Sequence, residues 1–122
     1  MIKLIFHILN IIFIALYLYP GSILGYLIYG NFSKQPQITA DLLVSSNHVY
    51  AFLVLSVIGL ISYYNNNKKF IIIYLLFISI FLELFHLVIP NRVFQFSELF
   101  GNIFGVLLSL LIFNLKNYWR KK

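Results

Sequence analysis

Apolar residues occur in long runs separated by short polar stretches, and this pattern predicts the elements of the chain. A membrane core about 30 Å thick is crossed by roughly 20 helical residues. Four runs approach or reach that length, at about residues 4–19, 48–64, 70–89 and 99–115. We therefore predict an all-α membrane protein in which a bundle of four transmembrane helices forms a single domain over residues 1–122.

The borders of these runs carry residues that stop or start helices. Pro20 ends the first run and Pro90 ends the third, because proline lacks a backbone donor. Ser97 is placed to cap the fourth helix, and Glu98 lies in its first turn, where a carboxylate suits the helix dipole. The polar sequence at 65–69 is so short that the second and third spans are expected to be antiparallel neighbours.

Two segments between the runs are expected to remain outside the spans. Residues 22–29 are apolar but too short to cross, so they either lie at the membrane interface or extend the first helix after a kink. Residues 31–47 form a polar loop. A cleaved signal peptide is the rival interpretation of the first run, but large residues precede Pro20 where a peptidase needs small ones.

Composition and charge agree with a membrane protein. Hydrophobic residues make up 61% of the 122 residues and charged residues only 10%, against about 25% charged residues in an ordinary soluble domain. The net charge of +6 comes from basic residues that flank the apolar runs, which argues against a nucleic-acid interface. The chain has no cysteine, which excludes disulfides and thiolate metal sites.

The basic residues also predict an orientation. With four spans, Lys34 and Arg92 fall on one side of the membrane, and the other seven basic residues fall on the opposite side: Lys3, Lys68, Lys69, Lys116, Arg120, Lys121 and Lys122. Positive residues favour the cytoplasmic side, so both termini are expected in the cytoplasm. All acidic residues then lie in the outward half, and membrane lipids are the expected surroundings.

A polar seam at residues 83–102 holds the candidate site. Glu83 lies about 10 Å below Pro90 along a helix, where an unpaired carboxylate costs about 2.5–3.5 kcal/mol. Helical spacing places two polar stripes on single faces: Ser79, Glu83, His86 and Pro90 on the third span, and Glu98, Asn102, Gly105 and Ser109 on the fourth. The Gly101-x-x-x-Gly105 spacing permits close helix approach.

Six residues are the candidate site residues, because the seam places them at one level of the membrane: Glu83, His48 and His86 as catalytic groups, and Arg92, Glu98 and Asn102 as anion-binding or substrate-binding groups. Histidine exchanges protons near neutral pH. Arg92 is expected to neutralise Glu83 or Glu98, and its guanidinium can hold a carboxylate or a phosphate at two points.

The spacing Glu83-x-x-His86 is also that of metal ligands in four-helix di-iron proteins. Those sites need a second such pair and further glutamates, whereas this chain has two glutamates in all. A mononuclear site from Glu83, His86 and His48 is geometrically possible, but we assign no metal and no cofactor. The chain has no phosphate-binding glycine loop and no Ser-His-Asp order.

The sequence from residue 41 to residue 115 resembles the VanZ-like membrane proteins. Their pattern has a glutamate, a glutamine three residues later, Pro-x-Arg, an acidic residue, and an asparagine before a glycine-rich span. The matching residues are Glu83, Pro90, Arg92, Phe94, Asn102 and Gly105, with Glu98 in place of an aspartate, and His48, Ala51 and Phe52 at the second span. The chain departs at His86, where the family has glutamine, and at Val44, where it commonly has aspartate.

The resemblance implies a multi-pass protein of the bacterial cytoplasmic membrane that belongs to the cell envelope. It also implies a link to resistance to teicoplanin-type glycopeptides. The leading hypothesis is that the outward polar pocket binds or acts on a lipid-linked or cell-wall anionic group. The alternative is a non-catalytic interaction or assembly protein whose polar residues only tie helices together. Whether a reaction is catalysed and whether the chain forms a homodimer are left open.

Overall fold

Helices make up most of the chain, and no strand is present in this computed structural model, which describes residues 1–122. The all-α class predicted from the sequence is therefore confirmed. In chain order the elements are α1 (Ile2–Leu18), α2 (Ile23–Tyr29), α3 (Ser46–Leu84), the 3-10 helix η1 (Phe85–Leu87) and α4 (Phe96–Arg120).

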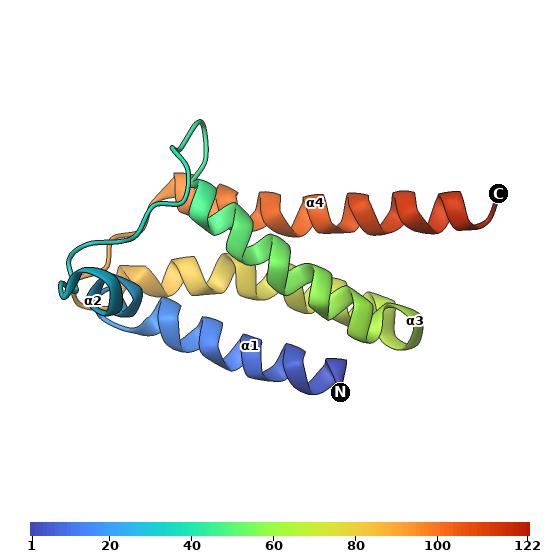
Figure 1. The fold of residues 1–122 in the computed structure, drawn as a ribbon, viewed down its shortest axis with the longest axis horizontal. Helices are drawn as coiled ribbons and strands as arrows, with labels where there is room; N and C mark the ends of the chain where they lie inside the picture. Colours follow the sequence, from blue (N-terminus) through green and yellow to red (C-terminus); the bar gives the residue numbers. More distant parts are fainter.

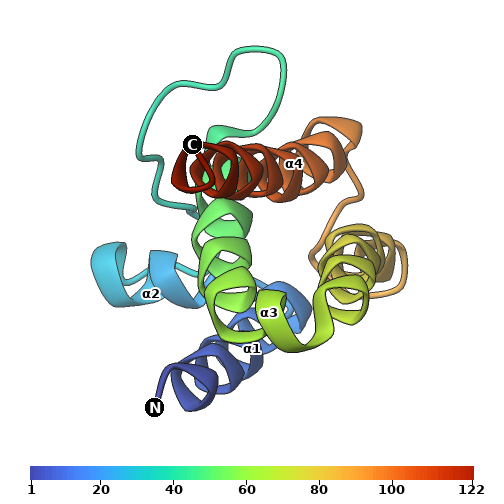
Figure 2. The same cartoon turned by 90° about the vertical axis from the view of Figure 1, so that its right-hand side faces the viewer.

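The 39 residues of α3 form a hairpin of two helical limbs (Figures 1 and 2). Asn67 has φ −140° and ψ 52°, outside the helical region, and the chain reverses there. We call residues 46–66 the first limb and residues 68–84 the second limb. Each limb is about 25–32 Å long at 1.5 Å per residue. The antiparallel hairpin predicted from residues 65–69 is confirmed.

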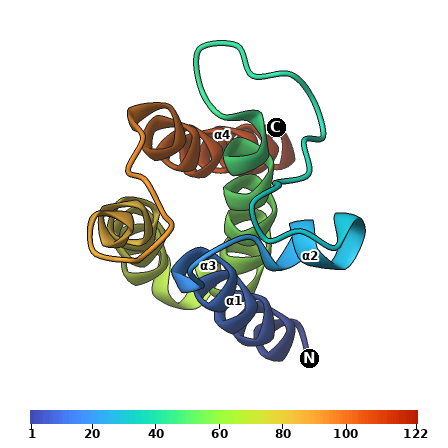
Figure 3. The same ribbon diagram turned by 90° about the vertical axis from the view of Figure 1, so that its left-hand side faces the viewer.

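The molecule has two chemically different ends (Figure 1). Both termini and the reversal of α3 lie at one end, which we call the basic end because seven of the nine lysines and arginines belong to these segments. The other end, called the polar end, carries α2, η1 and the long loop before α3 (Figure 3). The connections before α3 and before α4, which hold Lys34 and Arg92, lie at the polar end (Figure 1).

A sharp bend separates α1 from α2. The axes of the two helices differ by 86°, and Pro20 lies between them. Ser22 caps α2 by accepting a hydrogen bond from the backbone of Gly25. A Cβ atom at Gly25 would collide with the Lys34 carbonyl oxygen, so only glycine permits this packing of α2 against the loop. A kink, which one of the two expectations for residues 22–29 included, is therefore present between α1 and α2.

Two predicted helix boundaries are wrong. The second limb ends at Leu84, well before Pro90, because the chain tightens into η1 and then turns at Asn91, whose φ is 61°. Tightening of this kind is common at helix ends. Ser97 is not the cap of the last helix, since α4 begins one residue earlier, with Gln95 at the N-cap position. Glu98 lies in the first turn of α4, as predicted.

Glycine lets α4 pack closely on the first limb of α3. A Cβ atom at Gly105 would lie 2.6 Å from the Val49 carbonyl oxygen, and one at Gly101 would lie 2.8 Å from that of Ser45. The close approach predicted from the glycine spacing is confirmed, with the first limb as the partner. The buried core beside this contact joins α1, both limbs and α4: Phe6, Tyr17, Phe52, Leu55, Leu60, Ile71, Leu75, Ile78, Leu82 and Val106.

Apolar side chains also cover the outer faces of the helices. Leu4 is 63% exposed, Ile11 67% and Leu107 50%. Two helical stretches, residues 46–87 and α4, are long and apolar enough to cross a membrane. The bent pair of α1 and α2 adds a third if the pair counts as one span.

Candidate functional site

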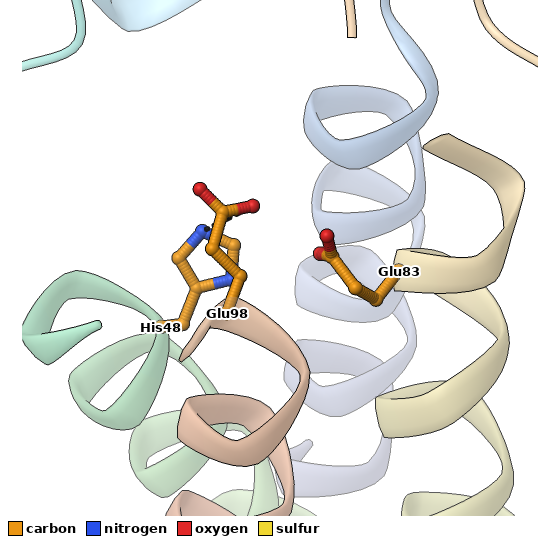
Figure 4. A group of neighbouring side chains, drawn as sticks. All are labelled: His48, Glu83 and Glu98. Carbon is orange, nitrogen blue, oxygen red and sulfur yellow. Dashed lines mark ion pairs between the residues drawn. The ribbon is translucent and has the colours of Figure 1, made fainter. Parts of the chain in front are cut away.

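Four titratable side chains meet at the polar end, and we call them the polar cluster: His48, Glu83, His86 and Glu98. They come from the first limb, the second limb, η1 and α4. Figure 4 shows His48, Glu83 and Glu98 directed from three helical segments toward one space. His48 Nε2 lies 3.6 Å from Glu98 Oε2, and His86 Nδ1 lies 3.3 Å from Glu83 Oε1 and 3.9 Å from Glu98 Oε2.

Asn102 fixes the orientation of the His48 ring. Its Nδ2 donates to the Ser79 carbonyl at 3.0 Å, so its Oδ1 is available only as an acceptor. Oδ1 accepts from the Tyr17 hydroxyl at 3.0 Å and lies 2.8 Å from His48 Nδ1. Nδ1 therefore carries a hydrogen atom, and the other ring nitrogen, Nε2, faces Glu98.

The His86 ring is oriented by a main-chain acceptor. Its Nε2 lies 2.9 Å from the carbonyl oxygen of Tyr17, so Nε2 is the donor. The second ring nitrogen, Nδ1, then faces the two glutamates. His86 is 2% exposed and its Nδ1 has no hydrogen-bond partner. Both histidines of the polar cluster thus direct an unengaged nitrogen toward carboxylates.

The two glutamates differ in environment. Glu83 is fully buried, and its Oε1 accepts a hydrogen bond from the backbone of Gln95 at 3.0 Å. Its Oε2 is buried without any hydrogen-bond partner. The side chain of Glu98 is 15% exposed. The Glu83 side chain therefore turns into the protein and not toward the outer apolar faces.

The expectation that Arg92 neutralises Glu83 or Glu98 is wrong. No ion pair joins Arg92 to either glutamate. Its Nη2 donates to the Leu16 carbonyl at 2.8 Å and its Nε to the Tyr19 carbonyl at 3.0 Å. These carbonyls lie at the end of α1, where a cation is favoured by the helix dipole. The Tyr19 carbonyl also accepts from the backbone N–H of Gly21 at 2.9 Å.

Partial burial does not remove the positive charge of Arg92. Desolvation lowers the pKa of Arg92 from its ordinary value. The guanidinium keeps its charge because that ordinary value lies far above neutral pH.

Two cavities adjoin the polar cluster. The first, called the polar pocket, has a volume of about 650 Å³ and is lined mainly by polar groups, among them His86, Arg92, Gln95 and Glu98. The second, called the apolar pocket, has a volume of about 560 Å³ and is lined by aliphatic and aromatic side chains of α1, α2 and the first limb. The two pockets share four lining residues: Ser22, Gln35, His86 and Arg92.

The structure brings five of the six predicted site residues together, and it adds Tyr17. Arg92 is the exception, since it lies at the edge of the polar pocket and is bound to α1. Tyr17 was missed because its spacing shows no relation to the polar seam. A hydroxyl group in the last turn of an apolar helix was the only available signal.

Asp41 lies in the loop outside the polar cluster. Its Oδ1 accepts hydrogen bonds from the backbone and the hydroxyl of Ser46 at the start of α3. The backbone N–H of Ser46 holds the pKa of Asp41 below its ordinary value. Asp41 therefore supports a helix start and takes no part in the site.

Comparison with protein-family models, with curated proteins and with solved structures gives no match. Function is therefore inferred from the residues and their geometry.

Proposed function

We propose that this chain is a VanZ-like, four-span protein of the bacterial cytoplasmic membrane whose outward polar pocket binds or acts on a lipid-linked or cell-surface anionic group. The apolar outer faces support a membrane location. The separation of basic and polar ends supports termini on the cytoplasmic side. The residues that match the VanZ-like pattern lie between His48 and Gly105. The same part of the chain, from α3 to α4, supplies the polar cluster.

The observation that carries this proposal is the pair of adjoining pockets. A ligand with a charged head and an apolar tail needs a polar cavity and an apolar cavity side by side. The polar and apolar pockets share Ser22, Gln35, His86 and Arg92, so one ligand can occupy both. Pockets that hold small ligands usually have volumes of about 300–1,000 Å³.

Arg92 can assist an anionic head despite its bonds to α1. Its Nε and Nη2 atoms are engaged by carbonyls, whereas Nη1 makes no hydrogen bond within the protein. Because Arg92 lines both pockets, its positive charge lies at their junction. Charged nitrogen donors to phosphate form short and strong hydrogen bonds. Glu83, His48 and His86 are the groups that would accept or pass protons near the head.

Ligand-induced stabilisation of the purified protein tests the proposal. Dodecyl phosphate carries a phosphate and a tail, dodecanol only the tail, and inorganic phosphate only the head. We expect dodecyl phosphate to raise the melting temperature in detergent at concentrations where the other two have little effect, because binding stabilises the folded state. Equal effects of dodecyl phosphate and dodecanol would contradict recognition of an anionic head.

Matched substitutions locate the binding site. Ser33→Trp fills the polar pocket and Val54→Trp fills the apolar pocket, and both positions are exposed. Leu107→Trp is the control, because Leu107 is equally exposed, at 50% against 52% for Val54, and lines neither pocket. Both pocket variants should lose the stabilisation by dodecyl phosphate, and the control should keep it. In cells, a VanZ-like role predicts lower susceptibility to teicoplanin with the control than with either pocket variant.

A non-catalytic interaction or assembly protein is the second candidate, favoured by the hydrogen bonds that join Tyr17, Ser79 and Asn102 from three elements. Glu83→Gln separates the candidates. Glutamine keeps the oxygen that accepts from Gln95 and removes a buried charge whose Oε2 has no partner. A functional site predicts unchanged or higher thermal stability together with lost activity, whereas a purely structural ion pair with His86 predicts lower stability.

A further inference from the structure

The polar cluster holds two carboxylates and no permanently charged cation. Glu83 is fully buried, the Glu98 side chain is 15% exposed, and their neighbours within ion-pair distance are His48 and His86, which are charged only when protonated. Two carboxylates close together in a partly buried site repel each other unless a positive charge lies between them. The same repulsion would oppose an anionic ligand in the adjoining polar pocket. A cation bound between the carboxylates would remove this repulsion.

The ring nitrogens are arranged to bind such a cation. His48 donates through Nδ1 to the Asn102 oxygen, and His86 donates through Nε2 to the Tyr17 carbonyl. Histidines that bind metals usually donate their second nitrogen to a carbonyl or carboxylate oxygen, which orients the first nitrogen toward the metal. The atoms left facing inward include two buried ones without any hydrogen-bond partner, His86 Nδ1 and Glu83 Oε2.

We propose that His48, Glu83 and Glu98, with His86 as a fourth ligand, bind a divalent transition-metal ion such as Zn²⁺. Ligand atoms of His48, Glu83 and Glu98 all lie within 4.8 Å of one another. Tetrahedral zinc with bonds of roughly 2.0–2.1 Å has ligand atoms about 3.4 Å apart. His48 Nε2 and Glu98 Oε2 are 3.6 Å apart, close to that value. His86 lies outside this group of three, and its Nδ1 is 3.3 Å from Glu83 Oε1 and 3.9 Å from Glu98 Oε2.

The ligand types select the class of metal. Two imidazoles and two carboxylates suit zinc and similar transition metals, whereas calcium and magnesium prefer oxygen ligands alone. His86 and Glu98 also line the polar pocket, so the ion would be reachable from it. A bound ion would neutralise the two glutamates and attract an anionic group. No metal was assigned from the sequence alone, so the metal site is an addition from the structure. It does not depend on which anionic ligand occupies the polar pocket.

Zinc binding by the full chain tests this inference. The protein is purified in detergent with a tag that contains no histidine, treated with a chelator, and titrated with Zn²⁺ against a chromophoric zinc chelator. We expect one Zn²⁺ per chain, and with Co²⁺ the visible absorption typical of tetrahedral coordination. Glu83→Gln and Glu98→Gln should each weaken binding beyond the roughly 10–100-fold that loss of an outer hydrogen-bond partner costs.

His7→Gln is the matched control, because His7 bonds to Tyr63 outside the polar cluster. It should leave the zinc affinity unchanged. Far-ultraviolet circular dichroism and size-exclusion elution establish that each variant is folded before its affinity is interpreted. The inference is overturned if the folded wild type binds no stoichiometric Zn²⁺, or if binding persists in both glutamate variants. Dodecyl phosphate binding is measured with and without Zn²⁺, so that failure of the metal site and failure of the lipid-linked ligand are distinguished.

Discussion

Asn102 is the residue whose loss should most damage the link between the helices. Its side chain is fully buried and makes three hydrogen bonds, to the Ser79 carbonyl, the Tyr17 hydroxyl and His48 Nδ1. These partners lie on the second limb, α1 and the first limb. Leucine has the same number of side-chain heavy atoms but no polar atom, so Asn102→Leu would remove all three bonds. The Tyr17 hydroxyl and His48 Nδ1 would keep their contact with each other at 3.0 Å.

The expected loss in the free energy of unfolding follows from the number of hydrogen bonds that Asn102 makes. Hydrogen bonds between membrane helices average about 0.6 kcal/mol and reach about 1.7 kcal/mol. Three such bonds correspond to a loss of about 2–5 kcal/mol for Asn102→Leu. Tyr17→Phe removes the hydroxyl and its contacts with Asn102 Oδ1 and His48 Nδ1, and Asn102 Oδ1 keeps its contact with His48. Two such contacts correspond to a loss of about 1–3 kcal/mol.

Equilibrium unfolding in mixed detergent micelles measures both variants against the wild type. The ratio of the two losses is more informative than either alone, because both variants are measured in the same micelles. A loss for Asn102→Leu no larger than that for Tyr17→Phe would refute the reasoning, since it would mean that Asn102 does not hold three partners. Ala40→Leu, in the exposed loop, serves as a control that should change the free energy of unfolding little.

Three further predictions concern single contacts. Arg92→Met should lower the free energy of unfolding by about 1.5–3 kcal/mol, because two charged hydrogen bonds to α1 are lost at a partly exposed site, and Arg92→Lys should recover only part of this loss. Gly105→Ala should cost about 1–3 kcal/mol in the same assay, because the added Cβ would meet the carbonyl of Val49; a neutral result would exclude the close approach. Asp41 has a depressed pKa in the folded protein, so its stabilisation is complete above pH about 4 and is lost as the pH falls further. The Ser46 amide resonance should report this titration with a midpoint below about 4, and a midpoint at or above that value would contradict the contact.

The sequence by itself determined the features that depend on local chemistry. The apolar runs predicted the helices, and the short polar sequence at residues 65–69 predicted the reversal within α3. The spacing of Gly101 and Gly105 predicted a close helix contact, and the cost of an unpaired carboxylate within an apolar helix singled out Glu83 as a candidate site residue. Each of these inferences needs only neighbouring residues or one helical face, and such periodic patterns are visible in a linear sequence.

Only the tertiary structure decided which distant groups meet. Arg92 was expected to pair with a glutamate, but two of its nitrogen atoms donate to the Leu16 and Tyr19 carbonyls at the end of α1. Tyr17 completes the hydrogen bonds of His48 and His86 although about 30 and 70 residues separate them along the chain. Contacts of this kind depend on how helices pack in space. Helical periodicity shows which face of a helix packs, but it does not show which distant segment that face meets. The orientation of the two imidazoles toward the glutamates, on which the proposed metal site depends, follows from those contacts.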